Sequence, residues 1–164
     1  MTAKCPYKYD LIASMTTVGI LVASWLLPSG KTKSLKIMGI ACLAGAVVLW
    51  FLPIFTLKKY GKVNEGQKYF ETNAVVQDGI YAIIRHPQYL AYMLLVIGFT
   101  LVSQHWLIIL LAVITIIFFY LQGVAEEEEL RQKFPATYDV YCANTPRFNI
   151  LRGLLNWIIY RNGL

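Results

Sequence analysis

The chain has 164 residues, of which 57% are hydrophobic and only 15% are charged. A soluble domain of this size could not bury so much apolar surface in one core, so the composition excludes that class and predicts an integral membrane protein. The formal net charge of +6 fits orientation in a membrane and attraction to anionic headgroups better than nucleic-acid binding, since the sequence has no basic-aromatic RNA motif.

Four apolar runs predict four membrane-spanning helices, at residues 11–27, 37–57, 89–102 and 106–124. About 20 residues are needed to cross the hydrocarbon layer, so three of the runs are long enough. The third run is only about 21 Å long as a helix, so it spans only if it extends upstream or the bilayer thins around it. The first run is too long for a signal peptide and lacks a small-x-small cleavage site, so we expect it to be retained.

The basic residues predict the orientation of the chain. With four spans, both termini and the loop after the second span share one side, and the opposite loop holds only Lys31, Lys33 and Lys36. Loops rich in Lys and Arg stay in the cytoplasm, so we expect both termini there. The first side carries Lys4, Lys8, Lys58, Lys59, Lys62, Lys68, Arg85, Arg131, Lys133, Arg147, Arg152 and Arg161.

The organisation predicts one all-α membrane domain over residues 1–164, without repeats or linkers. Only residues 103–105 separate the third run from the fourth, so these two should form an antiparallel hairpin whose cytoplasmic ends bring 85–89 and 126–129 together. After an aromatic stretch, apolar residues from Ile150 to Ile158 recur at helical spacing between polar ones, which predicts an interfacial amphipathic helix.

Four consecutive glutamates, Glu126 to Glu129, follow directly on the last apolar run and repel one another. Glu127 and Glu129 can pair with the cations four residues later, Arg131 and Lys133. Glu126 has Leu130 at that position, so we expect its carboxylate on the inward face. There it needs a cation, and on the residues alone an ion pair with Arg85 and a ligand site are equally good interpretations.

His86 precedes a proline at the start of a helix, where a capping or packing role is the simpler interpretation and a ligand contact is the alternative. Tyrosines near the same end are typical of an interfacial aromatic belt, namely Tyr81, Tyr89, Tyr92, Tyr138 and Tyr141. The alternative is that Tyr81 and Tyr89 border a pocket for a flat or cationic ligand. Cys5, Cys42 and Cys142 lack CxxC spacing, so we expect neither a disulfide framework nor a metal site.

Two sequence blocks resemble the isoprenylcysteine carboxyl methyltransferase and phospholipid methyltransferase superfamily. The first runs from Asp78 to Tyr89 and ends in Arg-His-Pro-Gln-Tyr; the second has Glu126-Glu127 and the aromatic positions after it, and Arg147-Phe148 follows. The resemblance covers roughly residues 73–148, which it implies are the cofactor-binding and catalytic region, with scaffold helices in 1–57. Paired blocks on a membrane hairpin are more specific than either block alone.

The resemblance implies S-adenosylmethionine as the cofactor, with S-adenosylhomocysteine as the product. Its binding residues would be Asn73, Ala74, Val75, Val76, Tyr81, His86, Pro87, Gln88, Tyr89, Glu126 and Glu127. The catalytic assignments are Arg85, His86, Glu126 and Glu127, and the substrate-binding ones are Tyr92, Gln122 and Arg147. The sequence departs from the family pattern at Ala91, where glycine is usual, and at Asn149-Ile150 after Arg147-Phe148.

Gln122 bears on which molecule accepts the methyl group. It stands where the isoprenylcysteine enzymes resemble one another in having an arginine for the substrate carboxylate, and glutamine cannot replace that charge. We therefore favour methylation of a phospholipid amine. Isoprenylcysteine carboxyl methylation is the first alternative, an NADPH-dependent sterol-type reductase the second, and a non-enzymatic membrane assembly protein the third. We expect a lipid or lipid-modified acceptor and no nucleic-acid partner.

Overall fold

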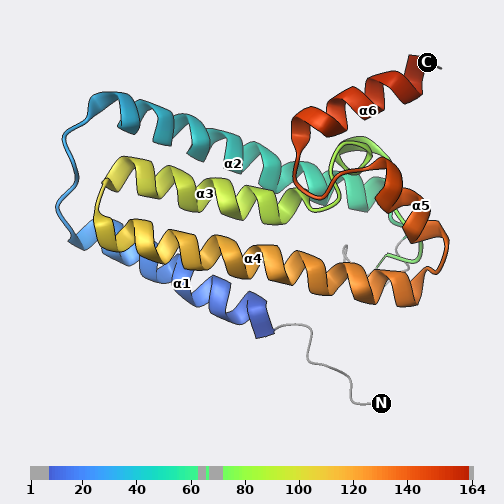
Figure 1. Ribbon diagram of the computed structural model, residues 1–164, viewed down its shortest axis with the longest axis horizontal. Coiled ribbons are helices and arrows are strands. Elements are labelled where there is room, and N and C mark those ends of the chain that lie inside the picture. Colours follow the sequence, from blue (N-terminus) through green and yellow to red (C-terminus); the bar gives the residue numbers. More distant parts are fainter. Residues whose placement is uncertain (1–7, 63–65, 67–71, 163–164) are drawn as a thin grey trace. The chain divides into compact units, whose positions relative to one another are not determined.

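The computed structural model describes residues 8–62, 66 and 72–162, and within these residues it contains helices and no strand (Figure 1). The all-α class is therefore confirmed. The helices are α1 (Lys8–Leu26), α2 (Lys33–Tyr60), the 3-10 helix η1 (Gly79–Ala82), α3 (Pro87–Ser103), α4 (Trp106–Lys133), α5 (Thr137–Asn144) and α6 (Ile150–Asn162). Of the residues named above, Lys4, Cys5 and Lys68 lie outside the described residues, as do the side chains of Lys8 and Arg161.

Among the described residues, three helices are long and apolar enough to cross a membrane: α1, α2 and α4. The third apolar run forms α3, which has 17 residues and gains its extra length at both ends. Helices α2 and α4 have 28 residues each and continue beyond their apolar runs into charged sequence, since Lys and Glu are good helix formers. Helix α2 also continues through Pro53 to Tyr60.

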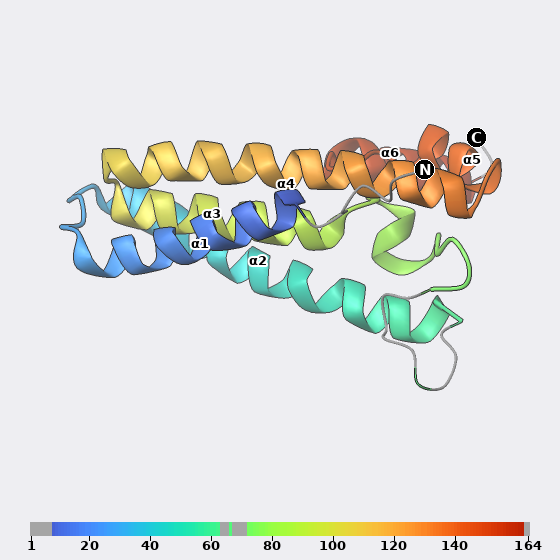
Figure 2. The ribbon, with the colours of Figure 1, turned by 90° about the horizontal axis from the view of Figure 1, so that it is seen from below.

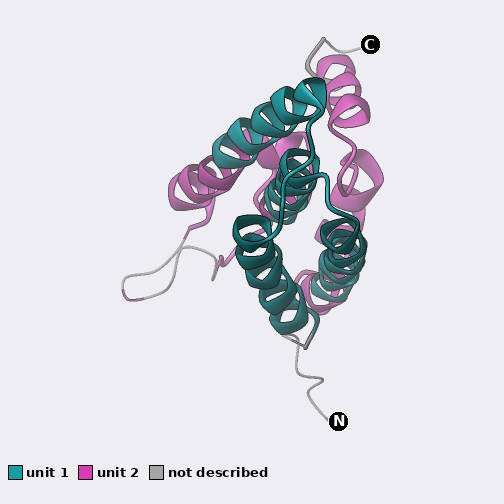
Figure 3. Cartoon of the chain, turned by 90° about the vertical axis from the view of Figure 1, so that its left-hand side faces the viewer, with its two compact units in different colours: residues 1–48, 89–126 teal, residues 49–88, 127–164 magenta. Residues whose placement is uncertain are grey.

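The chain divides into two compact units (Figure 3), and the boundaries fall inside α2, α3 and α4. Unit 1 comprises Met1–Val48 and Tyr89–Glu126. Its core contains the buried residues Ile20, Val96, Ile108 and Ala112, contributed by α1, α3 and α4. Two residues link α3 to α4, and the two helices run antiparallel (Figure 1), so the predicted hairpin is confirmed.

Small residues allow α2 and α3 to approach closely within unit 1. A Cβ atom built on Gly98 would lie 3.0 Å from the carbonyl oxygen of Gly39, so only glycine fits there without a shift. This contact explains part of the small-residue pattern of the second apolar run.

Unit 2 comprises Leu49–Gln88 and Glu127–Leu164. Helix α5, where the sequence indicates only an aromatic stretch, lies next to the C-terminal end of α4 in both ribbon views (Figures 1 and 2). Helix α6 packs through its backbone, because a Cβ on Gly153 would collide with the carbonyl group of Ile83. Its helical structure was predicted correctly from the residue spacing.

Candidate functional site

Glu127 is the centre of a buried ion cluster in unit 2. Its side chain has 0% exposure. Arg147 donates to both carboxylate oxygens, from Nε at 2.7 Å and from Nη2 at 2.8 Å. Nη1 of Arg85 lies 3.1 Å from Oε2, and Nε2 of His86 lies 3.1 Å from Oε1. The carboxylate is thus surrounded by two guanidinium groups and one imidazole, and its acceptor positions are occupied.

The buried glutamate is not the one predicted. We expected Glu126 on the inward face, with an ion pair to Arg85 and a ligand site as equal interpretations, but Glu126 is only half-buried and Arg85 contacts Glu127. Phe119, Gly123 and Glu127 follow at intervals of four along α4 and are all buried, but Gln122 and Phe119, four and seven residues before Glu126, are buried as well. Helical periodicity therefore does not decide between the two glutamates. Glu127 is the one that Arg85, His86 and Arg147 from other segments enclose.

Two backbone hydrogen bonds hold Arg85 and His86 in place. The amide of Arg85 donates to the carbonyl of Pro146 at 3.0 Å, and the amide of His86 donates to that of Arg147 at 3.3 Å. The segments around residues 85 and 147 therefore run side by side, although they are far apart in sequence. Phe148 lies beside His86, with ring centroids 5.9 Å apart. The burial of His86 beside Phe148 agrees with the packing interpretation, and its contact with Glu127 is a further role that the sequence did not indicate.

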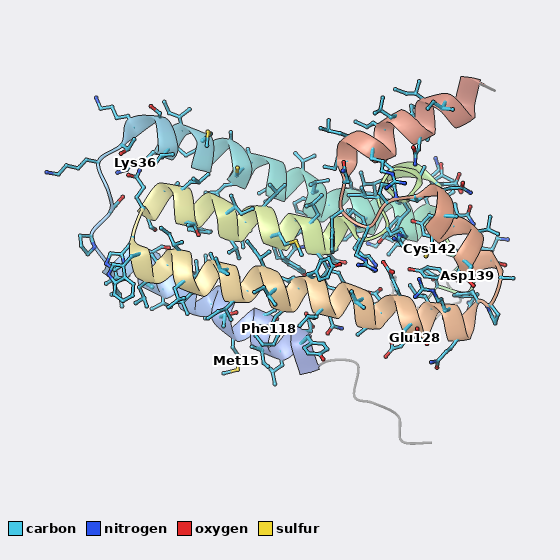
Figure 4. The ribbon with its side chains drawn as sticks, viewed as in Figure 1. Met15, Lys36, Phe118, Glu128, Asp139 and Cys142 are labelled. Carbon is cyan, nitrogen blue, oxygen red and sulfur yellow. The ribbon has the colours of Figure 1, made fainter. Side chains whose placement is uncertain are left out.

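Helix α5 supplies an outer layer around the cluster, and Figure 4 labels Asp139 and Cys142 on this helix. Nε of Arg131 donates to Asp139 at 3.1 Å, and Nη2 of Arg131 lies 3.8 Å from Glu127. The predicted pair of Glu127 with Arg131 is therefore confirmed as a longer contact. Nη1 of Arg85 also donates to Sγ of Cys142 at 2.7 Å.

Tyrosines of α5 lie inside unit 2. Tyr138 and Tyr141 are buried, with 2% and 4% exposure, so an aromatic belt is the wrong interpretation for these two. The hydroxyl of Tyr141 donates to the carbonyl of Tyr81 at 2.7 Å, which fastens α5 to η1. Burial raises the pKa of Tyr141 well above its usual range, so this donor stays protonated.

A second group of polar residues lies in unit 1, around Tyr89. Its hydroxyl is hydrogen-bonded to Glu126 and Gln122, and Asp10 acts on it electrostatically. The backbone amide of Asp10 donates to the side-chain oxygen of Gln122 at 3.2 Å, which joins α1 to α4. This group therefore contains two carboxylates. Asp10 was missed from the sequence, where a single acidic residue before an apolar run gave no signal.

Aromatic rings extend the Tyr89 group. The ring of Tyr92 stacks on Phe119 with centroids 5.1 Å apart and an interplanar angle of 17°, and the Tyr89 ring lies 6.1 Å from the same phenylalanine. Four of the residues assigned from the sequence to cofactor or substrate belong to unit 1, namely Tyr89, Tyr92, Gln122 and Glu126. Their neighbours in the sequence motifs, Gln88 and Glu127, belong to unit 2.

The segment 73–76 belongs to unit 2 and is held to the end of α2. Asn73 donates from its backbone to Gly61 at 3.3 Å and from its side chain to the carbonyl of Lys62 at 3.0 Å. Along this segment Asn73 is exposed and Val76 is buried. The segment therefore has a defined backbone path, and Val76 anchors it in the core.

A family model described as phospholipid methyltransferase matches residues 35–137 of the chain. The matched range includes α2 from its third residue, η1, α3 and α4, and thus Glu126 and Glu127 but not Arg147. Searches of curated proteins and of solved structures gave no match.

Proposed function

This chain belongs to the phospholipid methyltransferase family, and we propose that it transfers methyl groups from S-adenosylmethionine to an amine of a membrane lipid. The family and the three long apolar helices make it a membrane methyltransferase. We further propose four spans, of which α3 is the shortest, with both termini in the cytoplasm. The region 73–148 then carries most of the site. The first two helices act as scaffold, except that Asp10 of α1 belongs to the site.

The chemistry of the donors and acceptors fits the cofactor. Nε of Arg85 is buried and has no hydrogen-bond partner among the described residues. Such a donor is costly to leave unpaired, and a carboxylate is its natural partner. The carboxylates of Asp10 and Glu126 suit an ammonium or sulfonium, and the rings of Tyr89 and Tyr92 suit cations and adenine.

The charge of the Tyr89 group is the observation that carries the choice of acceptor. Glu126 and Asp10 both act on the Tyr89 hydroxyl, and Gln122 is neutral. Two carboxylates at one site attract a protonated amine and repel an acceptor that is itself a carboxylate. This supports methylation of an amine over formation of a carboxyl ester.

When bound, the cofactor would supply an electrophilic methyl group on a sulfonium, with the thioether of S-adenosylhomocysteine as the leaving group. The protein has to align the acceptor and remove a proton from its ammonium group, because only the free amine has a lone pair for attack. Glu127 is poorly suited as the base, since Arg147, Arg85 and His86 occupy its oxygens. We assign proton removal to Glu126, which Tyr89 orients through its hydroxyl.

The test is to incubate the detergent-purified protein with methyl-labelled S-adenosylmethionine, total membrane lipids and a prenylcysteine. Label on lipid that resists mild alkali is the expected result, because an N-methyl bond survives it. Glu126→Gln should lower the rate by a factor of about 100 or more, which is typical of a lost general base. Glu128→Gln is the matched control, since its side chain is 65% exposed on the same helix, and it should keep the rate.

Other outcomes contradict specific parts of the proposal. Label released as methanol would show a carboxyl ester and restore the isoprenylcysteine alternative. Full activity of Glu126→Gln would remove its assignment as the base. Absence of both transfer and cofactor binding would refute the methyltransferase function of this chain.

A further inference from the structure

Unit 2 contains a cavity of about 640 Å³ that none of the ion-cluster residues lines. It lies among η1, α5 and α6, and its volume is within the range of about 300–1,000 Å³ that is usual for small-molecule sites. Arg85, His86, Glu127 and Arg147 are all outside its lining. The polar and aromatic lining includes Asp78, Asn144, Arg152, Asn156 and Trp157.

The cavity offers one negative and one positive side chain. Asp78 precedes η1, but its carboxylate makes no capping hydrogen bond. Arg152 uses its backbone amide to bond Asn149 at 3.0 Å. Within the described part of the chain, neither charged group has a hydrogen-bond or ion-pair partner. The two are therefore available to a ligand that carries both a cation and an anion.

The backbone holds Asp78 at the cavity. Gly79 has a positive φ of 57°, which non-glycine residues rarely adopt, and a Cβ on it would lie 2.9 Å from the side chain of Thr56. The turn is therefore built around glycine, and it directs the chain from the cavity wall into η1. This gives a structural reason for the Asp-Gly pair, which the ion cluster and the Tyr89 group do not use.

Helix α6 places an apolar surface beside the cavity. Leu151, Leu155 and Ile158 are exposed, with 76%, 61% and 46% exposure, and they follow one another at intervals of four and three. Each is directly followed in sequence by a cavity-lining residue, Arg152, Asn156 and Ile159. Successive residues are about 100° apart around a helix, so the apolar row and the cavity row are adjacent. A ligand with its polar end in the cavity can thus lay an apolar chain along α6.

We propose that this cavity is a second ligand site, which binds the headgroup of a zwitterionic phospholipid with its phosphate on Arg152 and its ammonium on Asp78. The guanidinium group is suited to phosphate oxygens, and the carboxylate to an ammonium. The amides of Asn144 and Asn156 and the indole of Trp157 complete a polar and aromatic lining. The lipid chains follow the apolar row of α6. Binding here requires neither the cofactor nor methyl transfer.

The test measures binding to the detergent-purified full chain by calorimetry, without cofactor. The three probes are dihexanoylphosphatidylethanolamine, dihexanoylphosphatidic acid, which lacks the ammonium, and glycerophosphoethanolamine, which lacks the chains. Arg152→Gln should raise the Kd of both lipids about tenfold, as expected for one lost charge-assisted contact. Asp78→Asn should raise the Kd of the zwitterionic lipid alone. Lys31→Gln, which removes an exposed charge outside the cavity, should change neither.

Three results would overturn the proposal. Unchanged binding of the zwitterionic lipid in both cavity variants would place its site elsewhere. An equal loss of both lipids in Asp78→Asn would remove the ammonium contact. Equal affinity for glycerophosphoethanolamine and the lipid would mean that the cavity takes a soluble zwitterion. Both substituted side chains are exposed, and thermal unfolding of each variant verifies that it is folded.

Discussion

Replacing Glu127 by glutamine tests the buried ion cluster. Glutamine keeps the shape of the side chain but removes its charge and turns one acceptor oxygen into a donor, so Arg85 and Arg147 lose their counter-charge. Removing one partner of a buried ion pair costs about 3–5 kcal/mol. Arg147 is 25% exposed, so water can replace the lost contact of its guanidinium group. Arg85 is only 11% exposed, so it alone bears most of the cost. We therefore expect the lower end, a loss of about 3 kcal/mol in the free energy of unfolding.

The assay is thermal unfolding in detergent, followed by tryptophan fluorescence. A loss of about 3 kcal/mol corresponds to a decrease of about 6–12 °C in Tm for a chain of this size. Glu128→Gln is the control, because Glu128 is exposed and its contact with Arg131 is 3.9 Å long, so its contribution is small. Equal decreases in Tm for the two variants would refute the reasoning, since burial and the contacts of Glu127 would then contribute nothing.

Three further substitutions test separate parts of the structure. Gly153→Ala should displace α6 and lower Tm, whereas Gly45→Ala, where a Cβ meets nothing within 4 Å, should leave Tm unchanged or raise it slightly; thermal unfolding of both checks this. Tyr141→Phe should cost about 1 kcal/mol below pH 10 through loss of the bond to Tyr81. Because the pKa of Tyr141 is raised in the folded state, that advantage of the wild type should shrink as pH rises above about 10, as the unfolded tyrosine ionises. Asp10→Asn should weaken binding of the amine acceptor, seen as a raised KM, and an unchanged KM would remove Asp10 from the site.

The helices could be predicted because long apolar runs and helical spacing are local signals. The run at 106–124 became α4, and the spacing from Ile150 became α6. Helix α5 gave no such signal, since its buried Tyr138 and Tyr141 are tyrosines that equally suit a membrane interface. Its structure depends on contacts with η1, which a local pattern cannot reveal.

The site could be predicted only as far as its motifs reach. The glutamates and the His-Pro segment were found by position, but which glutamate is buried depends on the register of α4 against distant segments. Arg147 was expected to bind substrate, and the structure pairs it with Glu127 through two hydrogen bonds. A role for Arg147 toward the substrate stays a prediction. Asp10 became visible only through its contacts with Gln122 and Tyr89.

The two backbone hydrogen bonds from Arg85 and His86 to the segment at 146–147 make local opening of this segment measurable. These amides can exchange with deuterium only when the C-terminal segment detaches from them, and such local opening occurs far more often than global unfolding. Their exchange rates would therefore measure, in the native protein, how often the segment at 146–147 leaves the cluster. A bound ligand that holds the segment in place would slow exchange at these two amides while leaving the fraying ends of the other helices unaffected.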